Sequence, residues 1–350
     1  MVWLSLGLRA LVNVEALNMA ESVGNFVRHR KAAIVVRSDS RYIVRYVPVV
    51  SGESMGHAYQ SWIARLASKS NLPLCGYCER EEFVKHAQPQ LFGGKAWEVQ
   101  LADMITKGER EKGRRYEPGD VESSIVANCV VEDIGGFLVT ARIPVKRTSR
   151  FICGYMVPAV DALEAAVVEP QLHVRHSPTA MRVAVEGEEA RGQMIYYVEV
   201  GSAVYSWSFG VDLSSVGVST YTNKPVVDDK ARRARVELAL DALAHMLESN
   251  MFGAKQSRFN PVISYESVLL TLGKDTPFMV SSPTRSSYIE ETVKRANKMS
   301  EKYGYKFKLV GYAGFDSVKS EMSNLGVEVG DTIADAIARI KEEALSWLRL

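Results

Sequence analysis

The chain has 350 residues, of which 47% are hydrophobic and 24% charged, a balance typical of a folded protein with a large core. Its formal net charge is +2, which excludes a globally basic chain, so any anion-binding site has to come from local clustering. The longest apolar runs fall far short of the roughly 18 to 20 residues that span a bilayer, so no membrane partner is expected.

The first 18 residues lack a basic region ahead of their apolar stretch, and we interpret them as a first strand of the fold, not a signal peptide. We therefore expect a cytoplasmic location. Two runs rich in β-branched and aromatic residues, 32–36 and 42–47, flank the turn residues 38–40 and predict a β-hairpin. A helix with Ser54 as its N-cap follows. Its apolar residues recur at helical spacing: Met55, Tyr59, Trp62, Ile63 and Leu66.

The connection between hairpin and helix contains Ser51, Gly52, Ser54, Gly56 and His57. Its two glycines permit close backbone approaches that a Cβ would block. The helix start offers free N–H groups and the positive end of the helix dipole, which favour a phosphate. Because the sequence has no GxxxxGK[ST] loop, we expect a phosphodiester backbone here and not a nucleoside triphosphate. A plain strand-to-helix connection is the alternative.

Residues 68–124 have weaker periodicity and predict a surface insertion, a lid with some helix. The mixed-charge run 107–115 suits a solvated surface. Cys75 and Cys78 form one CxxC, but no second ligand pair stands at zinc spacing, and His57 or His86 could complete a site only through the fold. Zinc, a redox pair or disulfide, and an incidental pair therefore stay open, and we expect no metal or cofactor. The remaining cysteines lie in apolar runs and are expected in the core: Cys129 and Cys153.

The remainder of the chain alternates strand and helix signals and predicts a single α+β domain over residues 1–350. Strands are expected at 125–131, 136–139, 181–185, 194–200 and 204–213, with a turn at 186–189 that makes residues 178–200 a long β-arm. Helices are expected at 230–251 and around 289–303 and 333–344. The first of these has an apolar stripe through Val236, Leu240, Leu243, Leu247 and Met251, with Arg235 placed off it.

Cations gather in local clusters along the chain. They comprise Arg28, Arg30 and Lys31; Lys146, Arg147 and Arg150, in a stretch without an acid; Lys255 and Arg258; and, as a fourth group, Arg175 with His176. Each cluster mixes cations with small polar residues or exposed backbone, which suits holding phosphate and sugar more than reading bases. No RNP1 pattern is present, so recognition by stacking bases on a sheet is not expected.

Catalytic motifs are missing from the sequence: there is no nucleophile elbow, Walker motif, dinucleotide fingerprint or HExxH. Among the six histidines, His173 and His176 flank Arg175 and could serve as general acid and base in a metal-independent ribonuclease. We keep that ribonuclease as the alternative and expect a non-catalytic protein.

Six motifs in order carry a family resemblance: SGESMGHAY, NCVVEDIGGFL, IPVKRTSRF, HVRHSP, QMIYYVEVGSAVYSWSFGVDL and FGAKQSRFNP. Over about residues 1–280 the chain resembles the DevR-type CRISPR-associated autoregulators of the RAMP superfamily, in which it looks like the backbone subunit of an archaeal type I-A Cascade complex. The resemblance implies a ferredoxin-like (RRM-like) core with large insertions. It also implies a β-hairpin thumb, which we place at about 174–197.

The resemblance further implies that copies of a non-catalytic subunit stack head to tail along CRISPR RNA, with other Cascade subunits and, through the guide, a target nucleic acid as partners. Delegating sequence recognition to base pairing leaves the protein to grip the RNA backbone. The residues that we predict to bind RNA are Asn18, Arg28, Arg30, Lys31, Ser51, Gly52, Ser54, His57, Lys146, Arg147, Arg150, Arg175, His176, Lys255 and Arg258.

Overall fold

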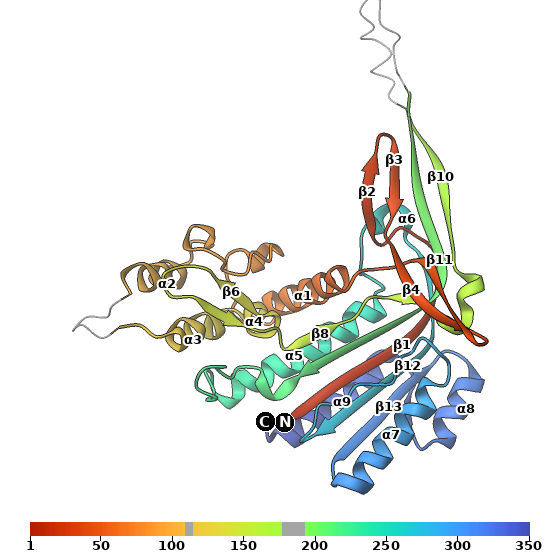
Figure 1. The fold of residues 1–350 in the computed structure, drawn as a ribbon. Helices are drawn as coiled ribbons and strands as arrows, with labels where there is room; N and C mark the ends of the chain where they lie inside the picture. The colour runs from red at the N-terminus through yellow and green to blue at the C-terminus, as the bar shows by residue number, and fades with distance from the viewer. Residues whose placement is uncertain (109–114, 177–192) are drawn as a thin grey trace, which may run out of the picture.

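The computed structural model describes residues 1–108, 115–176 and 193–350 and has a mixed α+β architecture (Figure 1). Its large sheet has the order β14-β13-β12-β1-β11-β3-β2, and β8, β9 and β10 also pair with β11. The strands of this sheet are β1 (Val2–Glu15), β2 (Met19–Val23), β3 (Phe26–His29), β8 (Phe151–Cys153), β9 (Val157–Pro158), β10 (Val167–His176), β11 (Gln193–Asp212), β12 (Val262–Lys274), β13 (Lys306–Ala313) and β14 (Glu328–Gly330).

Helices cover both faces of the large sheet. Helices α1 (Gly52–Lys69), α5 (Asp229–Glu248) and α9 (Ile333–Leu348) lie on one face, and α7 (Tyr288–Tyr303) and α8 (Asp316–Asn324) lie on the other (Figure 1). The predicted helices near 230–251, 289–303 and 333–344 are confirmed. Strands β12 to β14 and helix α8 were not predicted. Among the described residues, no helix combines the length and apolar character needed to cross a membrane.

Strand β1 is the centre of the sheet and pairs antiparallel with both β11 and β12. Leu6 faces Phe209 on one side and Leu270 on the other, and all three side chains are buried in the core under α1, α5 and α9. Because side chains alternate along a strand, Arg9 points to the opposite face. There its guanidinium pairs with Asp161 at 2.9 Å and with Glu266 at 3.2 Å.

The predicted insertion 68–124 contains α2 (Ala96–Lys107) and α3 (Pro118–Asn128), which share a small hydrophobic core with a two-stranded sheet of β6 (Phe137–Val139) and β7 (Val145–Arg147). The prediction of a strand over 125–131 is wrong, because α3 is followed directly by α4 (Val130–Gly135). Pro118 at the first helical position and the capping box between Glu117 and Asp120 start α3, and Ile125 is buried between helices.

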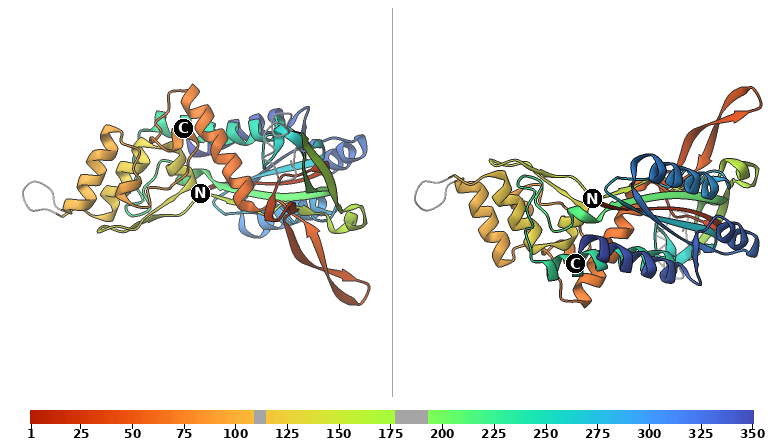
Figure 2. Two further views of the ribbon diagram at one scale, coloured as in Figure 1. Left: turned by 90° about the horizontal axis from the view of Figure 1, so that it is seen from above. Right: turned by 90° about the horizontal axis from the view of Figure 1, so that it is seen from below.

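Three strand pairs stand at the end of the molecule opposite to α2, α3 and β6 (Figures 1 and 2). They are β2–β3, the confirmed hairpin of β4 (Lys31–Ser38) with β5 (Arg41–Pro48), and β10–β11. The strands predicted at 194–200 and 204–213 are parts of the single strand β11. The strand and turn predicted at 181–185 and 186–189 lie outside the described residues.

Two predicted helix boundaries need correction. The N-cap of α1 is Ser51, not Ser54, because the Ser51 Oγ accepts the Ser54 N–H. Helix α5 ends at Glu248, so Met251 lies beyond it and is half exposed. Arg235, predicted off the apolar stripe of this helix, is nonetheless buried, for the electrostatic reason given below.

Candidate nucleic-acid interface

Helix α1 starts in a tightly packed connection. The Ser51 Oγ accepts the Ser54 N–H at 3.3 Å, and the Ser51 N–H donates to Asn18 Oδ1 at 3.3 Å. A Cβ on Gly52 would lie 2.5 Å from the Cys153 carbonyl oxygen, so only glycine fits where β8 passes the helix start. Ser51 is 4% exposed and its hydroxyl already caps the helix, so the predicted direct contact of Ser51 with phosphate is not available in this arrangement.

Three segments distant in sequence meet at this helix start. The Ala254 N–H donates to the Leu17 carbonyl at 2.7 Å, and the Arg30 N–H donates to the Asn18 carbonyl at 2.8 Å. Leu17 and Asn18 therefore join β3–β4 and the loop before α6 (Gln256–Phe259) to the α1 N-terminus. The fold thus brings the two segments that carry the first and third cation clusters to this helix start through backbone hydrogen bonds.

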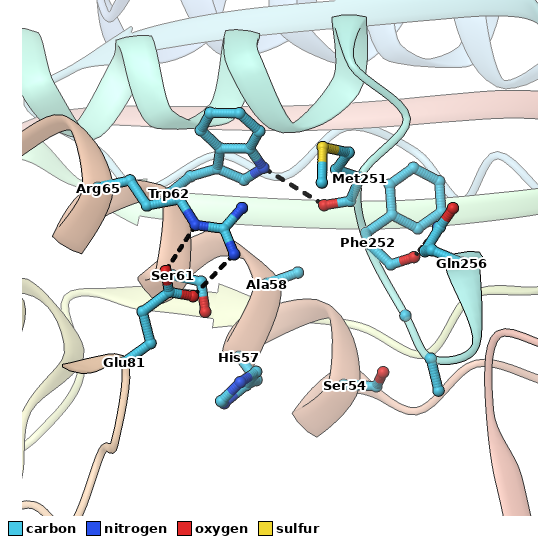
Figure 3. Close-up of a pocket in the computed structure, with 12 residues that line it drawn as sticks. Ser54, His57, Ala58, Ser61, Trp62, Arg65, Glu81, Met251, Phe252 and Gln256 are labelled. Atoms are coloured by element: carbon cyan, nitrogen blue, oxygen red, sulfur yellow. Dashed lines mark hydrogen bonds and ion pairs between the residues drawn. The ribbon is translucent and has the colours of Figure 1, made fainter. Parts of the chain in front are cut away.

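A groove of about 420 Å³ runs between α1 and residues 251–256 (Figure 3). Its far end is fixed by the Trp62 indole, which donates to the Met251 carbonyl at 3.3 Å, and by the Arg65–Glu81 ion pair at 2.6 Å. Ser54 and the exposed His57 line its near end. Trp62, expected on the apolar face of α1, is partly buried against the core and also lines the groove.

Lys255 and Arg258 are the cations of the loop and short helix whose residues 254 and 256 line this groove. Neither has an ion-pair partner among the described residues, and Arg258 is exposed. Partial burial, followed by the charge of Arg258, holds the pKa of Lys255 below its usual value. Glu53 adds one exposed negative charge in the first turn of α1, so an anion at this helix start needs the two cations.

The first cluster is largely neutralised within the chain. Arg28 pairs with Glu21 at 3.2 Å on an exposed surface, and Lys31 pairs with Glu199 at 3.1 Å. The Arg30 Nε is buried and has no hydrogen-bond partner among the described residues. These side chains lie beside the base of the β-arm, where a polyanion would have to compete with the two carboxylates.

The second cluster lies elsewhere, and one of its members is misassigned. Arg147 is 2% exposed: its guanidinium pairs with Glu122 at 2.8 Å and with Asp133, so its predicted contact with RNA is wrong for this fold. Asp133 also receives Arg235 at 2.7 Å, which explains the burial of that side chain. Residues 142–150 contain no acidic residue, but α3 supplies Glu122 and α4 supplies Asp133.

The other members of the second cluster remain partly accessible. Lys146 is exposed on β7. Arg150 is half-buried and donates to Thr220 Oγ1 at 2.9 Å, and burial followed by the charge of Arg147 lowers its pKa. Lys146 lies on β7, which pairs with β6 at the end of the molecule remote from β2, β3 and α6, and the Arg150 N–H donates to the Ile134 carbonyl of α4 at 2.8 Å (Figure 1).

Arg175 and His176 end β10, where their backbones pair with Met194 and Gln193, and their side chains lie outside the description. His173, two residues earlier, stacks on Tyr196 at 5.3 Å between ring centroids and meets the edge of Phe259 at 5.5 Å. This aromatic contact joins the β-arm to α6.

Three buried polar side chains hold β1, β3 and β11 together at the base of the β10–β11 arm. His29 Nε2 lies 2.6 Å from Glu15 Oε1, and the Tyr205 O–H donates to the same oxygen at 2.6 Å. Burial by itself lowers the pKa of His29, but the Glu15 carboxylate outweighs burial and raises it.

This raised pKa predicts a pH dependence of stability. Because the folded-state pKa of His29 is raised, its contribution is complete below about pH 6.5, the ordinary histidine pKa, and is lost as pH rises through the raised pKa. Urea unfolding measured from about pH 6.5 up through the raised pKa is expected to show a stability difference between wild type and His29→Gln that shrinks as pH rises. A difference that does not change with pH would contradict this account.

Comparisons with known proteins give a consistent picture. A family model described as "CRISPR-associated negative auto-regulator DevR/Csa2" matches residues 6–293. The "CRISPR-associated aCascade subunit Cas7/Csa2 2" of Saccharolobus solfataricus is 34% identical over 347 residues, which cover 96% of this chain and 98% of the relative. The "CRISPR-associated protein Cas7/Cst2/DevR" of Methanocaldococcus jannaschii is 27% identical over 314 residues, covering 87% and 91%.

Solved structures share the fold. A chain of a "CRISPR RNA-guided surveillance complex, pre-nicking" superposes with a TM-score of 0.54 at 12% identity, covering 98% of this chain and 99% of the other. A chain of a second "CRISPR RNA-guided surveillance complex" gives a TM-score of 0.53 at 11% identity, with the same coverage.

Proposed function

Because the chain belongs to the DevR/Csa2 family of CRISPR-associated proteins, with Cas7/Csa2 relatives in archaea, we propose that it is a non-catalytic, CRISPR-RNA-binding backbone subunit of a Cascade-type complex. One observation carries the proposal: the first turns of α1 and residues 251–256 line one groove, and the same loop and the helix α6 that follows it carry Lys255 and Arg258, which have no ion-pair partners among the described residues. Such a site suits a phosphate backbone and does not depend on base identity.

The order of strands supports a ferredoxin-like core within the larger sheet. Strands β12, β1, β11 and β8 are neighbours in that order, and each adjacent pair is antiparallel. Helix α1 connects β1 toward β8, and α5 connects β11 to β12. This is a βαββαβ arrangement, and the C-terminal strands β13 and β14 extend its β12 edge.

Exposed apolar strand faces support head-to-tail assembly of copies. On the β4–β5 hairpin, Val35 is 67% exposed, Val44 56% and Tyr46 78%, and all three share one face by register. The β10–β11 arm exposes Val174 (55%) and Ile195 (47%), which face each other across the ladder. Apolar surfaces of this kind mark interaction sites, and two different surfaces allow a heterologous contact that continues as a filament.

The ribonuclease alternative is less well supported. The His173 ring is packed between Tyr196 and Phe259, and its Nε2 is buried without a hydrogen-bond partner among the described residues. A general acid or base needs access to the scissile phosphate and an orienting partner. The arrangement of His173 favours a role in attaching the arm to α6 over a role in cleavage.

The phosphate assignment predicts the effect of reversing charge at the groove. Lys255→Glu with Arg258→Glu is expected to weaken binding to single-stranded RNA of every sequence, because two cations beside the α1 N-terminus are lost. The slope of log affinity against log salt should fall in magnitude by about 1.4, from about 0.7 per phosphate contact. Fluorescence anisotropy with guide-length RNA at several salt concentrations measures both quantities, and electron microscopy of the wild-type mixture is expected to show filaments.

A matched charge reversal provides the control. Lys294 and Lys298 are exposed on α7, on the opposite face of the sheet from α1, and each pairs with a surface acid of the same helix. Changing both to glutamate should leave the affinity and the salt slope close to wild type after allowance for net charge. Equal losses in the two double variants would show that RNA responds to net charge and not to the groove.

A further inference from the structure

The fold brings three of the four cysteines together. The Sγ atoms of Cys75, Cys78 and Cys129 all lie within 4.8 Å of one another, and each residue is buried. Cys75 and Cys78 form the CxxC after α1, whereas Cys129 comes from the junction of α3 and α4, where it was expected to be ordinary core. All four cysteines of the chain are free thiols.

A buried histidine faces this cluster. The ligand atoms of Cys75, His86 and Glu132 also lie within 4.8 Å of one another. His86 is 2% exposed, and neither ring nitrogen has a hydrogen bond among the described residues. Its Nε2 lies 3.3 Å from Glu98 Oε1, and its Nδ1 lies 3.7 Å from Glu132 Oε1. Burying an imidazole whose ring nitrogens make no hydrogen bond is costly, and a group bound between the ring and the three thiols would offset that cost.

The surroundings fit a metal ligand. A histidine that binds zinc commonly directs its other ring nitrogen at a carboxylate, and Glu98 occupies that position at Nε2. Glu98 is held in turn by the backbone N–H groups of Gly93 at 2.8 Å and Lys95 at 3.0 Å. Nδ1 is then the ring nitrogen that remains to bind an ion. It faces Glu132, which together with Cys75 and His86 forms the second group of potential ligands.

We propose that Cys75, Cys78, Cys129 and His86 form a structural zinc site. Zn–S bonds of about 2.3 Å and Zn–N bonds of about 2.0–2.1 Å in a tetrahedron separate ligand atoms by about 3.6 to 3.8 Å. Cys75 belongs to both groups of potential ligands, whose atoms lie within 4.8 Å of one another, so it links the three thiols to His86. A Cys₃His set leaves no open coordination position, as in zinc sites that stabilise a fold. Binding releases the thiol protons and leaves three thiolates and a neutral imidazole on Zn²⁺.

The proposed ion would fasten the insertion to the core. Cys75 and Cys78 follow α1, Cys129 lies between α3 and α4, and His86 is on the connecting segment before α2. That segment has little regular structure, with short 3₁₀ turns at Cys78–Arg80 and Pro89–Leu91, so a tetrahedral centre would add order to the hydrophobic packing of Leu74, Cys75 and Cys78 against the core. This role is independent of RNA binding.

Metal content and cobalt spectra test the proposal on the full chain. Wild-type protein purified without chelators is expected to contain about one zinc per chain by plasma mass spectrometry. Metal-free protein, reduced and titrated with Co²⁺, should develop the visible d–d bands of a tetrahedral site and a thiolate charge-transfer band in the near ultraviolet. Cys78→Ser and Cys129→Ser should lose zinc. Cys153→Ser, which removes the one cysteine outside the cluster, should keep it.

Several outcomes would overturn the assignment. Wild-type protein that contains no zinc and gives no tetrahedral cobalt spectrum excludes the site, and this measurement does not depend on any variant folding. A Cys75–Cys78 disulfide found by alkylation and mass spectrometry of freshly purified protein would replace it with the redox alternative. If Glu132→Gln loses zinc while His86→Ala keeps it, the fourth ligand is Glu132 and the proposed set is wrong.

Discussion

Replacing Arg147 by alanine is expected to lower the free energy of unfolding by about 3–5 kcal/mol, the usual cost of removing one partner from a buried ion pair. The guanidinium is fully buried between Glu122 at 2.8 Å and Asp133, and it also donates to the Asp133 and Val218 carbonyls. Its loss leaves two buried carboxylates with fewer donors, although Arg235 still holds Asp133. Urea unfolding followed by circular dichroism measures the change.

The neighbouring residue is the matched control. Lys146 is exposed on β7, so Lys146→Ala should change stability by less than about 0.5 kcal/mol. If Arg147→Ala unfolds at the same urea concentration as wild type but binds RNA more weakly, the burial argument fails and the predicted phosphate contact has to be restored. A loss of stability with normal RNA affinity in the folded fraction is the expected pattern.

Arg147 also shows where sequence reasoning stops. Residues 142–150 contain four cations and no acid, which predicts an exposed basic loop. The compensating carboxylates, Glu122 of α3 and Asp133 of α4, lie on either side of the stretch 125–131 that was predicted as a strand. Pro118 and the capping-box residues Glu117 and Asp120 were the local signals for a helix. The charge balance of this cluster is set by tertiary contacts that no local pattern contains.

The α1 region behaves differently, because its structure is encoded locally. Glycines, a capping serine and a helical apolar period stand within a few residues of one another, and the turn and helix they predict are present. The sequence could not predict that the loop containing Ala254 packs at the start of α1. Ala254 is about 200 residues away and is held there by a backbone hydrogen bond to Leu17. The Cys129 thiol is a similar case, because only the fold places it beside Cys75 and Cys78.

Replacing Glu15 by alanine is the second change expected to have a large effect, about 3–5 kcal/mol of stability. The carboxylate is fully buried, and it serves three partners: the His29 ring at 2.6 Å, the Tyr205 hydroxyl at 2.6 Å and the Leu17 N–H at 2.7 Å. These partners belong to β3, β11 and the connection after β1. Its removal therefore leaves buried polar groups unpaired at the junction of three segments.

Because Leu17 also accepts the Ala254 N–H, the same substitution should disturb the groove and lower RNA affinity along with stability. Glu21→Ala is the control: that carboxylate forms an exposed ion pair with Arg28, which is worth less than about 1 kcal/mol. Urea unfolding and RNA anisotropy on both variants separate the two roles. A Glu15→Ala protein that keeps wild-type stability would mean that the buried carboxylate, His29 and Tyr205 do not hold the base of the arm. Normal stability with weakened RNA binding would instead mean that Glu15 acts on the groove through Leu17 without stabilising the fold.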